Sequence, residues 1–176
     1  MRKIPDWYVI TGGPNSGKTT IINRLSELGY YTVPEVARLF IDKELKEGKT
    51  LKQIRSAKIK FQNKITKLKI MLDKKVPKDA VVFFDRGLPD ILAYCKFLNV
   101  VPSKLLINLP ENRYKKIFLL DLLSYKKDYA RNESLKEAKR IYKLVKETYK
   151  QLGYDVIKVP VMSVGDRVKL ILKNIK

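Results

Sequence analysis

A short run near the N-terminus has the residue types and the spacing that bind phosphate. Residues 12–19 read GGPNSGKT, which fits the pattern G-x-x-x-x-G-K-S/T. Glycines let the backbone curl until its N–H groups converge on phosphate oxygens. Lys18 would neutralise the β- and γ-phosphates, and the Thr19 hydroxyl would ligate Mg²⁺. The run predicts a P-loop that binds ATP, or GTP, through Gly12, Gly13, Pro14, Asn15, Ser16, Gly17, Lys18, Thr19 and Thr20.

An aspartate and an arginine follow a second apolar stretch. Residues 80–84 read AVVFF, and Asp85 and Arg86 come directly after them. A carboxylate at the end of a parallel strand lies along the edge where open α/β sheets bind ligands. We expect Asp85 to hold Mg²⁺ directly or through water; the alternative is a helix N-cap or a structural pair with Arg86. Arg86 would contact substrate or phosphate, or only pair with a carboxylate.

A second acid and base stand after another short strand. Glu35 and Arg38 follow residues 30–33 and are three positions apart, hence on one helix face. We interpret them as a substrate-facing acid and base; the alternative is a helix-start acid in an ion pair within the helix.

A polar stretch lies further along the chain, at residues 124–134, and it contains Arg131. In kinases such a segment closes over the nucleotide and excludes water. We expect a short lid that brings Arg131 to the transferring phosphoryl group; the alternative is an ordinary charged loop.

Alternating strands and helices must position these residues. Apolar runs predict strands at residues 7–11, 30–33, 80–85, 117–120 and 156–159. Helical periodicity predicts helices at 18–28, 35–45, 51–72, 91–98, 135–152 and 164–175. Near-continuous apolar strands are typical of a parallel sheet covered on both faces. The order predicts an α/β, three-layer P-loop NTPase with a five-stranded parallel sheet, as one domain over residues 1–176.

The chain is strongly basic, with a net charge of +20. Much of this charge lies between residues 52 and 75, where nine lysines and arginines accompany one acid, Asp73. Ile54, Phe61, Ile65, Leu68 and Leu72 fall at helical spacing there and predict one buried stripe. The basic face is interpreted as solvated surface, or alternatively as a docking surface for a polyanion.

Several classes of protein are excluded or disfavoured by composition. The chain contains no histidine, so histidine metal sites and histidine bases are excluded. Its one cysteine, Cys95, cannot form a disulfide within the chain, which favours a reducing cytoplasm. No apolar run reaches the roughly 20 residues of a transmembrane helix. No signal peptide is visible, because Asp6 interrupts the basic start. We expect a cytoplasmic protein with no transmembrane segment.

Three motifs together resemble a known family. Residues 10–20, ITGGPNSGKTT, residues 34–38, PEVAR, and residues 84–94, FDRGLPDILAY, are similar to predicted ATPases with an AAA-type P-loop domain. That domain is related to the nicotinamide-riboside kinase domain of bacterial NAD regulators. Asp85-Arg86 also resembles the Asp-Arg motif of thymidylate kinases, and Glu35 stands where those kinases carry a strand-end acid. The resemblance implies a nucleotide-kinase-like fold that binds Mg-nucleotide; one eukaryotic branch is associated with GTP and phosphoinositides.

Two functional hypotheses follow. The leading one is a Mg²⁺-dependent phosphotransferase that moves the γ-phosphoryl group of ATP to an unknown small acceptor. Such catalysis needs positioning and charge neutralisation. These would be supplied by Lys18, Thr19 with Mg²⁺, Asp85, Arg86 and Arg131. Glu35 would position or deprotonate the acceptor. The alternative is a protein that hydrolyses ATP or GTP and uses the nucleotide to switch binding to an anionic partner, either nucleic acid or phosphoinositide.

Overall fold

The computed structural model describes residues 4–108, 113–123 and 133–175. Its centre is a five-stranded parallel sheet with the strand order β2-β3-β1-β4-β5. This confirms the predicted α/β architecture with a parallel sheet. The strands are β1 (Trp7–Thr11), β2 (Tyr31–Val33), β3 (Val82–Asp85), β4 (Lys116–Leu120) and β5 (Val156–Val159).

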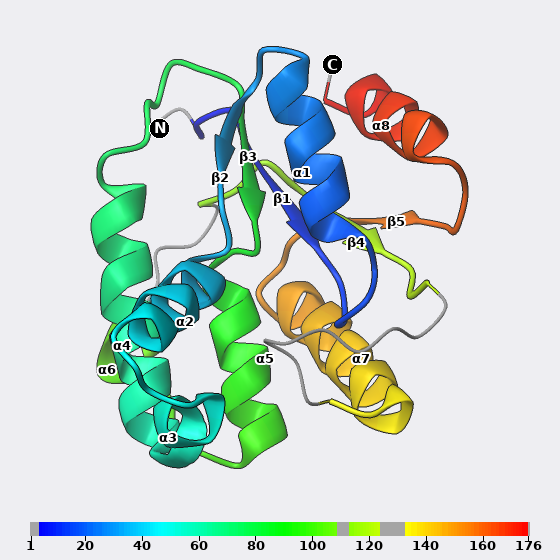
Figure 1. Cartoon of the computed structure of the whole chain (residues 1–176). Coiled ribbons are helices and arrows are strands. Elements are labelled where there is room, and N and C mark those ends of the chain that lie inside the picture. The colour runs from blue at the N-terminus through cyan, green and yellow to red at the C-terminus, as the bar shows by residue number, and fades with distance from the viewer. Residues whose placement is uncertain (1–3, 109–112, 124–132, 176) are drawn as a thin grey trace.

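Helices cover both faces of this sheet (Figure 1). They are α1 (Lys18–Glu27), α2 (Val36–Lys46), α3 (Leu51–Ser56), α4 (Lys58–Asp73), α5 (Leu88–Leu98), α6 (Lys104–Ile107), α7 (Leu135–Gln151) and α8 (Val164–Lys173). Helices α1 and α8 pack on one face, whereas α5 and α7 pack on the other. Helices α2, α4 and α6 pack against α5 in a further cluster. Within the described ranges, no helix has the length and apolar character needed to cross a bilayer.

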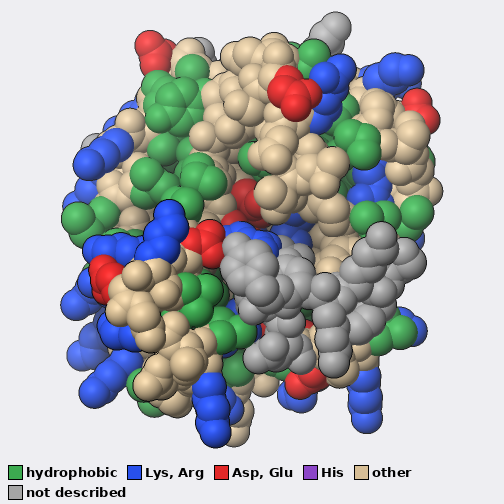
Figure 2. Space-filling view, viewed as in Figure 1, with side chains coloured by type: hydrophobic (Ala, Val, Ile, Leu, Met, Phe, Trp, Pro, Cys, Tyr) green, Lys and Arg blue, Asp and Glu red, His purple; other side chains and the backbone are tan. Residues whose placement is uncertain are grey.

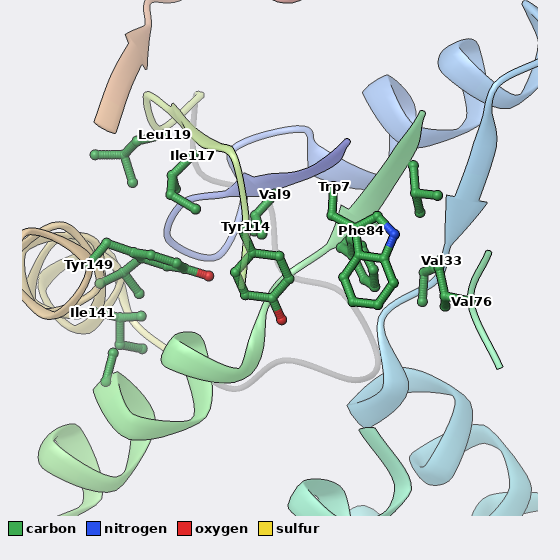
Figure 3. Close-up of a cluster of buried hydrophobic side chains, with 13 residues drawn as sticks. Trp7, Val9, Val33, Val76, Phe84, Tyr114, Ile117, Leu119, Ile141 and Tyr149 are labelled. Carbon is green, nitrogen blue, oxygen red and sulfur yellow. The ribbon is translucent and has the colours of Figure 1, made fainter. Parts of the chain in front are cut away.

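The two faces of β1 show why the strands carry such long apolar runs. Tyr8 and Ile10 belong to the core cluster that contains α1 and α8. Trp7 and Val9 belong to the opposite cluster, which also contains Tyr149 of α7 (Figure 3). Successive side chains of a strand point to opposite faces, so a strand buried on both sides has to be apolar at nearly every position.

The register places the predicted site residues along one edge. Strand β3 lies beside β1, with Asp85 opposite Ile10. Strand β2 lies beyond β3, where Val33 is opposite Phe84. Asp85 therefore ends the strand next to the P-loop strand, and Glu35 follows the strand one place further out.

Two predicted helices differ from the structure, and one short helix was not predicted. The basic helix expected at 51–72 is two helices, because Ala57 leaves helical backbone with φ −93° and ψ 73°. No glycine or proline marks that break, so local propensity gives no sign of it. Helix α5 begins at Leu88 rather than at residue 91, with Pro89 in its first turn. The short helix α6 was not expected, and its four residues are too few for a periodic signal.

Candidate functional site

The P-loop joins β1 to α1, and its backbone requires glycine at two positions. Gly12 has φ 147° and Gly17 has φ 82°, both in the region that favours glycine. A Cβ atom on Gly12 would lie 2.6 Å from the carbonyl oxygen of Leu120. Thr19 and Thr20 are exposed in the first turn of α1, whereas Pro14 and Ser16 are buried. The predicted strand, loop and helix arrangement is present.

Lys18 is folded over the loop. Its ammonium donates to the carbonyl oxygen of Gly13 at 2.8 Å, to Ser16 Oγ at 3.1 Å and to the Gly12 carbonyl oxygen at 3.4 Å. The residue is 2% exposed. A bound phosphate would offer charged oxygens in place of these neutral acceptors, and hydrogen bonds between charged partners are the stronger ones.

Thr19 and Asp85 meet where a Mg²⁺ ion would be expected. The Thr19 hydroxyl donates to Asp85 Oδ2 at 3.3 Å. Asp85 is buried, and its Oδ1 atom has no hydrogen-bond partner within the described part of the chain. Burial, and then the negative charge of Glu35, raise the pKa of Asp85 to about 6. A buried carboxylate oxygen without a partner is costly, and a cation would satisfy it.

These two side chains suit a magnesium ion that arrives with a nucleotide. Mg²⁺ is usually bound by one or two protein oxygens, several waters and substrate phosphates. Residues 4–108, 113–123 and 133–175 hold no cluster of three or more acidic or cysteine side chains that could bind a metal alone. The residues present therefore fit a nucleotide-bound Mg²⁺ rather than a permanent metal centre.

Arg86 links the predicted acids to the P-loop. Its Nε atom lies 3.2 Å from Glu35 Oε1, and its Nη1 atom donates to the carbonyl oxygen of Gly12 at 3.3 Å. Burial disfavours the charged guanidinium, but Tyr94, Glu35 and Asp90 raise the pKa of Arg86 above its usual value. The residue adopts φ 67°, which is uncommon for a side chain with a Cβ atom. Such strain is often kept where a side chain must be aimed.

Asp90 is a site residue that the sequence did not reveal. Its buried carboxylate accepts hydrogen bonds from Thr11 Oγ1, from the backbone N–H of Gly87 at 2.8 Å, from Arg86 Nη1 at 3.3 Å and from Tyr149 Oη at 2.6 Å. It thereby ties the P-loop strand, the β3–α5 turn and α7 together. The signal that could have found it is Pro89-Asp90, since proline and an acid are typical of a helix start.

A cavity of about 280 Å³ opens between α2, α4 and α5. Figure 2 shows acidic and basic side chains together near the centre of this face of the molecule. One end of the cavity is lined by Glu35, Asp85, Arg86 and Asp90, and Arg38 also lines it. The remaining walls are aromatic, aliphatic and basic, and include Val36, Ile41, Arg55, Lys58, Phe61, Gln62, Ile65, Lys69, Ile91, Tyr94, Phe97 and Glu133.

Glu35 stands at the start of α2, where it is the N-cap residue. Its side chain accepts no capping hydrogen bond from that helix. It pairs with Arg86 of the neighbouring strand instead, at the end of the cavity. The sheet edge therefore brings together Lys18, Thr19, Glu35, Asp85 and Arg86.

The buried face of α4 carries polar side chains, and one of them is Lys69 of the predicted basic face. Gln62, Thr66, Lys69 and Asp73 are buried, and their spacing of four, three and four residues puts them on one side of the helix. Lys69 Nζ lies 3.1 Å from Asp73 Oδ1 and 4.4 Å from the ring centre of Phe84. Burial lowers the pKa of Lys69, and Asp73 opposes this effect. The expected apolar stripe is thus mixed: Ile54 and Ile65 are buried, whereas Phe61, Leu68 and Leu72 are only partly buried.

The rest of the basic face is on the surface. Lys60, Lys64 and Lys67 of α4 are exposed, and Figure 2 shows basic side chains along the lower left, over α3 and α4. Arg55 of α3 forms an ion pair of 3.2 Å with Glu133, which precedes α7. Arg131 and the predicted lid up to residue 132 lie outside the described residues, so their prediction is not tested.

The fold and the phosphate loop define a P-loop domain of the nucleotide-kinase type. The chain belongs to the AAA domain family, whose model matches residues 7–167. A search of curated protein sequences found no match.

Solved structures of similar fold include a deoxyadenosine kinase, a thymidylate kinase and NadR. Deoxyadenosine kinase from M. mycoides with bound dATP has a TM-score of 0.69 at 20% identity, over 95% of this chain and 97% of that one. Thymidylate kinase from Ehrlichia chaffeensis has a TM-score of 0.64 at 13% identity, over 95% of this chain and 96% of that one. NadR in complex with NR has a TM-score of 0.68 at 14% identity, over 97% of this chain and 50% of NadR. At these identities the likeness shows the fold.

Proposed function

We propose that this protein is a Mg²⁺-dependent kinase that transfers the γ-phosphoryl group of ATP to a hydroxyl group of a nucleoside-like acceptor. The observation that carries the proposal is the cavity whose inner end holds Glu35 and Arg86 beside Asp85, while its walls are aromatic and hydrogen-bonding. A P-loop alone would fit any nucleotide-binding protein. A separate cavity at the same sheet edge would give a place to the group that receives the phosphate.

At the nucleotide end, the chain binds and orients the triphosphate. The loop N–H groups and Lys18 neutralise its charge, and Thr19 and Asp85 would hold the metal that accompanies it. When bound, Mg²⁺ would offset the negative charge of the β- and γ-phosphates and orient them. The orphaned Asp85 Oδ1 atom is the feature that supports this role.

At the acceptor end, Glu35 accepts the hydroxyl proton or orients the hydroxyl for attack. A bond then forms between the acceptor oxygen and the γ-phosphorus, the bond to the β-phosphate oxygen breaks, and ADP leaves. Arg86, held between Glu35 and Asp90, faces the charge that develops on the transferring group. We assign Arg38 to binding of the acceptor. Arg131 of the proposed lid would contact the transferring phosphoryl group.

The pocket's chemistry argues for a flat, polar acceptor. Phe61, Tyr94 and Phe97 line it and offer ring faces and edges, on which heterocycles stack. The Gln62 amide can both donate and accept, whereas Lys69 can only donate. Pockets for small ligands measure roughly 300–1,000 Å³, so a cavity of about 280 Å³ lies at the small end of this range and suits one nucleoside rather than a dinucleotide. The kinases of similar fold are named for acceptors of this class.

A direct transfer assay tests the proposal. The protein would be incubated with γ-labelled ATP, Mg²⁺ and a panel of ribonucleosides, deoxynucleosides, nucleoside monophosphates and pyridine nucleosides. We expect label on one member of this panel and no transfer when Mg²⁺ is chelated. Binding of RNA or phosphoinositide vesicles that requires the nucleotide, falls steeply with salt and occurs without any transfer would favour the switch alternative.

Replacing Lys69 with Met should weaken acceptor binding selectively. The substitution removes a donor at the pocket wall but leaves Asp73 paired with Arg113, whose Nη2 atom lies 3.0 Å away. We expect the KM for the acceptor to rise about tenfold, the effect of losing one strong hydrogen bond, while the KM for ATP is unchanged. Lys67→Met, two residues away and exposed, is the matched control. Equal effects of both substitutions would contradict the assignment.

The pKa of Asp85 predicts how Mg-nucleotide binding depends on pH. A carboxyl group with a pKa of about 6 is ionised above that value and neutral below it. Since only the ionised form attracts Mg²⁺, affinity for Mg-ATP should fall as the pH drops through 6. Titration calorimetry between pH 5 and 8 measures this. Asp85→Asn is the control, because it keeps the titration of ATP itself and should lack the additional step.

A further inference from the structure

Helix α8 contains an arginine that contacts the P-loop from behind. Arg167 is 2% exposed, and its guanidinium donates to three carbonyl oxygens. Nη1 donates to Ser16 of the P-loop at 2.7 Å, Nη2 to Asp121 after β4 at 3.3 Å, and Nε to Pro160 after β5 at 2.9 Å. One side chain thereby joins the loop to the ends of two neighbouring strands.

These partners are unusual for a buried cation, because each of them is a neutral carbonyl oxygen. The nearby carboxylate of Asp121 attracts the guanidinium only through space, because its oxygens pair with Tyr142 Oη at 2.7 Å and Lys158 Nζ at 3.1 Å. Burying a charge is costly unless it is paired. Packing alone would be served better by an apolar side chain, so the position calls for a role of the charge itself.

The contact with Ser16 controls one peptide unit of the loop. The Ser16 carbonyl and the Gly17 N–H belong to the same planar trans peptide, in which they point in opposite directions. A carbonyl held against α8 therefore turns the Gly17 N–H to the other side of the loop. In this motif the backbone N–H groups converge on phosphate. A cation on the carbonyl also polarises the peptide and makes its N–H a better donor.

The preceding peptide is held in the same way. The backbone N–H of Leu123 donates to the carbonyl oxygen of Asn15 at 2.9 Å. A Cβ atom on Gly17 would lie 3.1 Å from Leu123 and 3.4 Å from Arg167 Nη1, so glycine permits this close approach. Two consecutive loop carbonyls are thus fixed from behind, one by a neutral N–H and one by a guanidinium.

We infer that Arg167 is a positioning residue for the phosphates: it fixes and polarises the Ser16–Gly17 peptide and so raises the affinity of the P-loop for triphosphate. The inference rests on the nucleotide-binding part of the proposed function and is independent of the acceptor.

Binding of Mg²⁺ with inorganic tripolyphosphate tests the inference without a base or an acceptor. Arg167→Met should weaken tripolyphosphate and Mg-ATP by the same factor, about tenfold, as expected from losing one charge-assisted hydrogen bond. Arg167→Lys keeps the charge, but its ammonium cannot donate to three separated carbonyls, so several-fold weakening is expected. If Arg167→Met does not fold, the Lys variant decides the question.

The matched control is Val168→Ala, the next residue of α8, which is buried in the core cluster. It should lower the melting temperature while leaving tripolyphosphate affinity unchanged when binding is measured well below that temperature. Three results would overturn the inference. Both Arg167 variants could bind tripolyphosphate as tightly as the unsubstituted protein, or they could lose affinity for Mg-ATP but not for tripolyphosphate. In the third, Val168→Ala would lower tripolyphosphate affinity as much as the Arg167 variants do. Loss of acceptor phosphorylation with intact binding would instead count against the proposed function.

Discussion

Lys18→Ala is expected to lower phosphoryl transfer roughly 10²-fold or more, the scale on which losing one transition-state donor acts. The ammonium is buried in the loop, where it donates to Gly13 and Ser16. In the proposed complex it would neutralise charge on the β- and γ-phosphates. The steady-state kcat/KM for the labelled acceptor measures the effect, together with the affinity for Mg-ATP by calorimetry.

The fold of that variant should persist, because Lys18 contributes to neither of the core clusters against the sheet. Circular dichroism and thermal melting check this. Arg24→Ala is the control on the same helix, since Arg24 forms only an exposed pair with Glu27. Unchanged turnover and affinity in Lys18→Ala would rule out the proposed phosphate site.

Asp85→Asn should raise the Mg²⁺ requirement and depress every nucleotide-dependent activity, including slow background hydrolysis. The amide keeps the shape of the side chain but removes the charge that would attract the metal. A second effect has the opposite sign. Because Asp85 is buried with an unpaired oxygen and a raised pKa, the free protein should melt at a higher temperature after the substitution. Differential scanning calorimetry with and without Mg-ATP measures both effects.

The effect of Glu35→Gln should differ from that of Asp85→Asn. Glu35 follows the outer strand and lines the acceptor cavity, so Mg-ATP binding and background hydrolysis should stay nearly intact while transfer to the acceptor falls. Equal loss of Mg-nucleotide binding in both folded variants would show that the two acids share one role. Unfolding of Glu35→Gln would show that its pair with Arg86 is structural.

The sequence predicted those parts of the site that follow local rules. A glycine-rich turn that ends in Lys18-Thr19, between an apolar strand and a helix, is typical of a phosphate-binding loop, so the P-loop could be placed residue by residue. The acids Asp85 and Glu35 were found because strand ends in a parallel sheet meet at one edge. The strand order confirms that reasoning, since β3 lies between β1 and β2.

Other parts depend on contacts that no local pattern encodes. Lys69 looks like any other lysine of a basic helix, and its burial follows from Asp73 and Phe84 packing around it. Arg167 stands in an ordinary amphipathic helix 151 positions from Ser16. Ala57 breaks a helix without a breaker residue. Charged side chains in such places are held by tertiary partners, which a single sequence does not display.

The sheet separates the two halves of the site, and this has an evolutionary consequence. The loop that would hold the nucleotide is supported by α8, on the face that α1 also covers. Helices α4 and α5 lie on the other side (Figure 1), and they line the proposed acceptor cavity. Substitutions on the inner face of α4 can therefore change which acceptor is chosen without disturbing the phosphate donor. Under the proposed function, grafting the α3–α4 segment from one family member onto another should transplant acceptor preference.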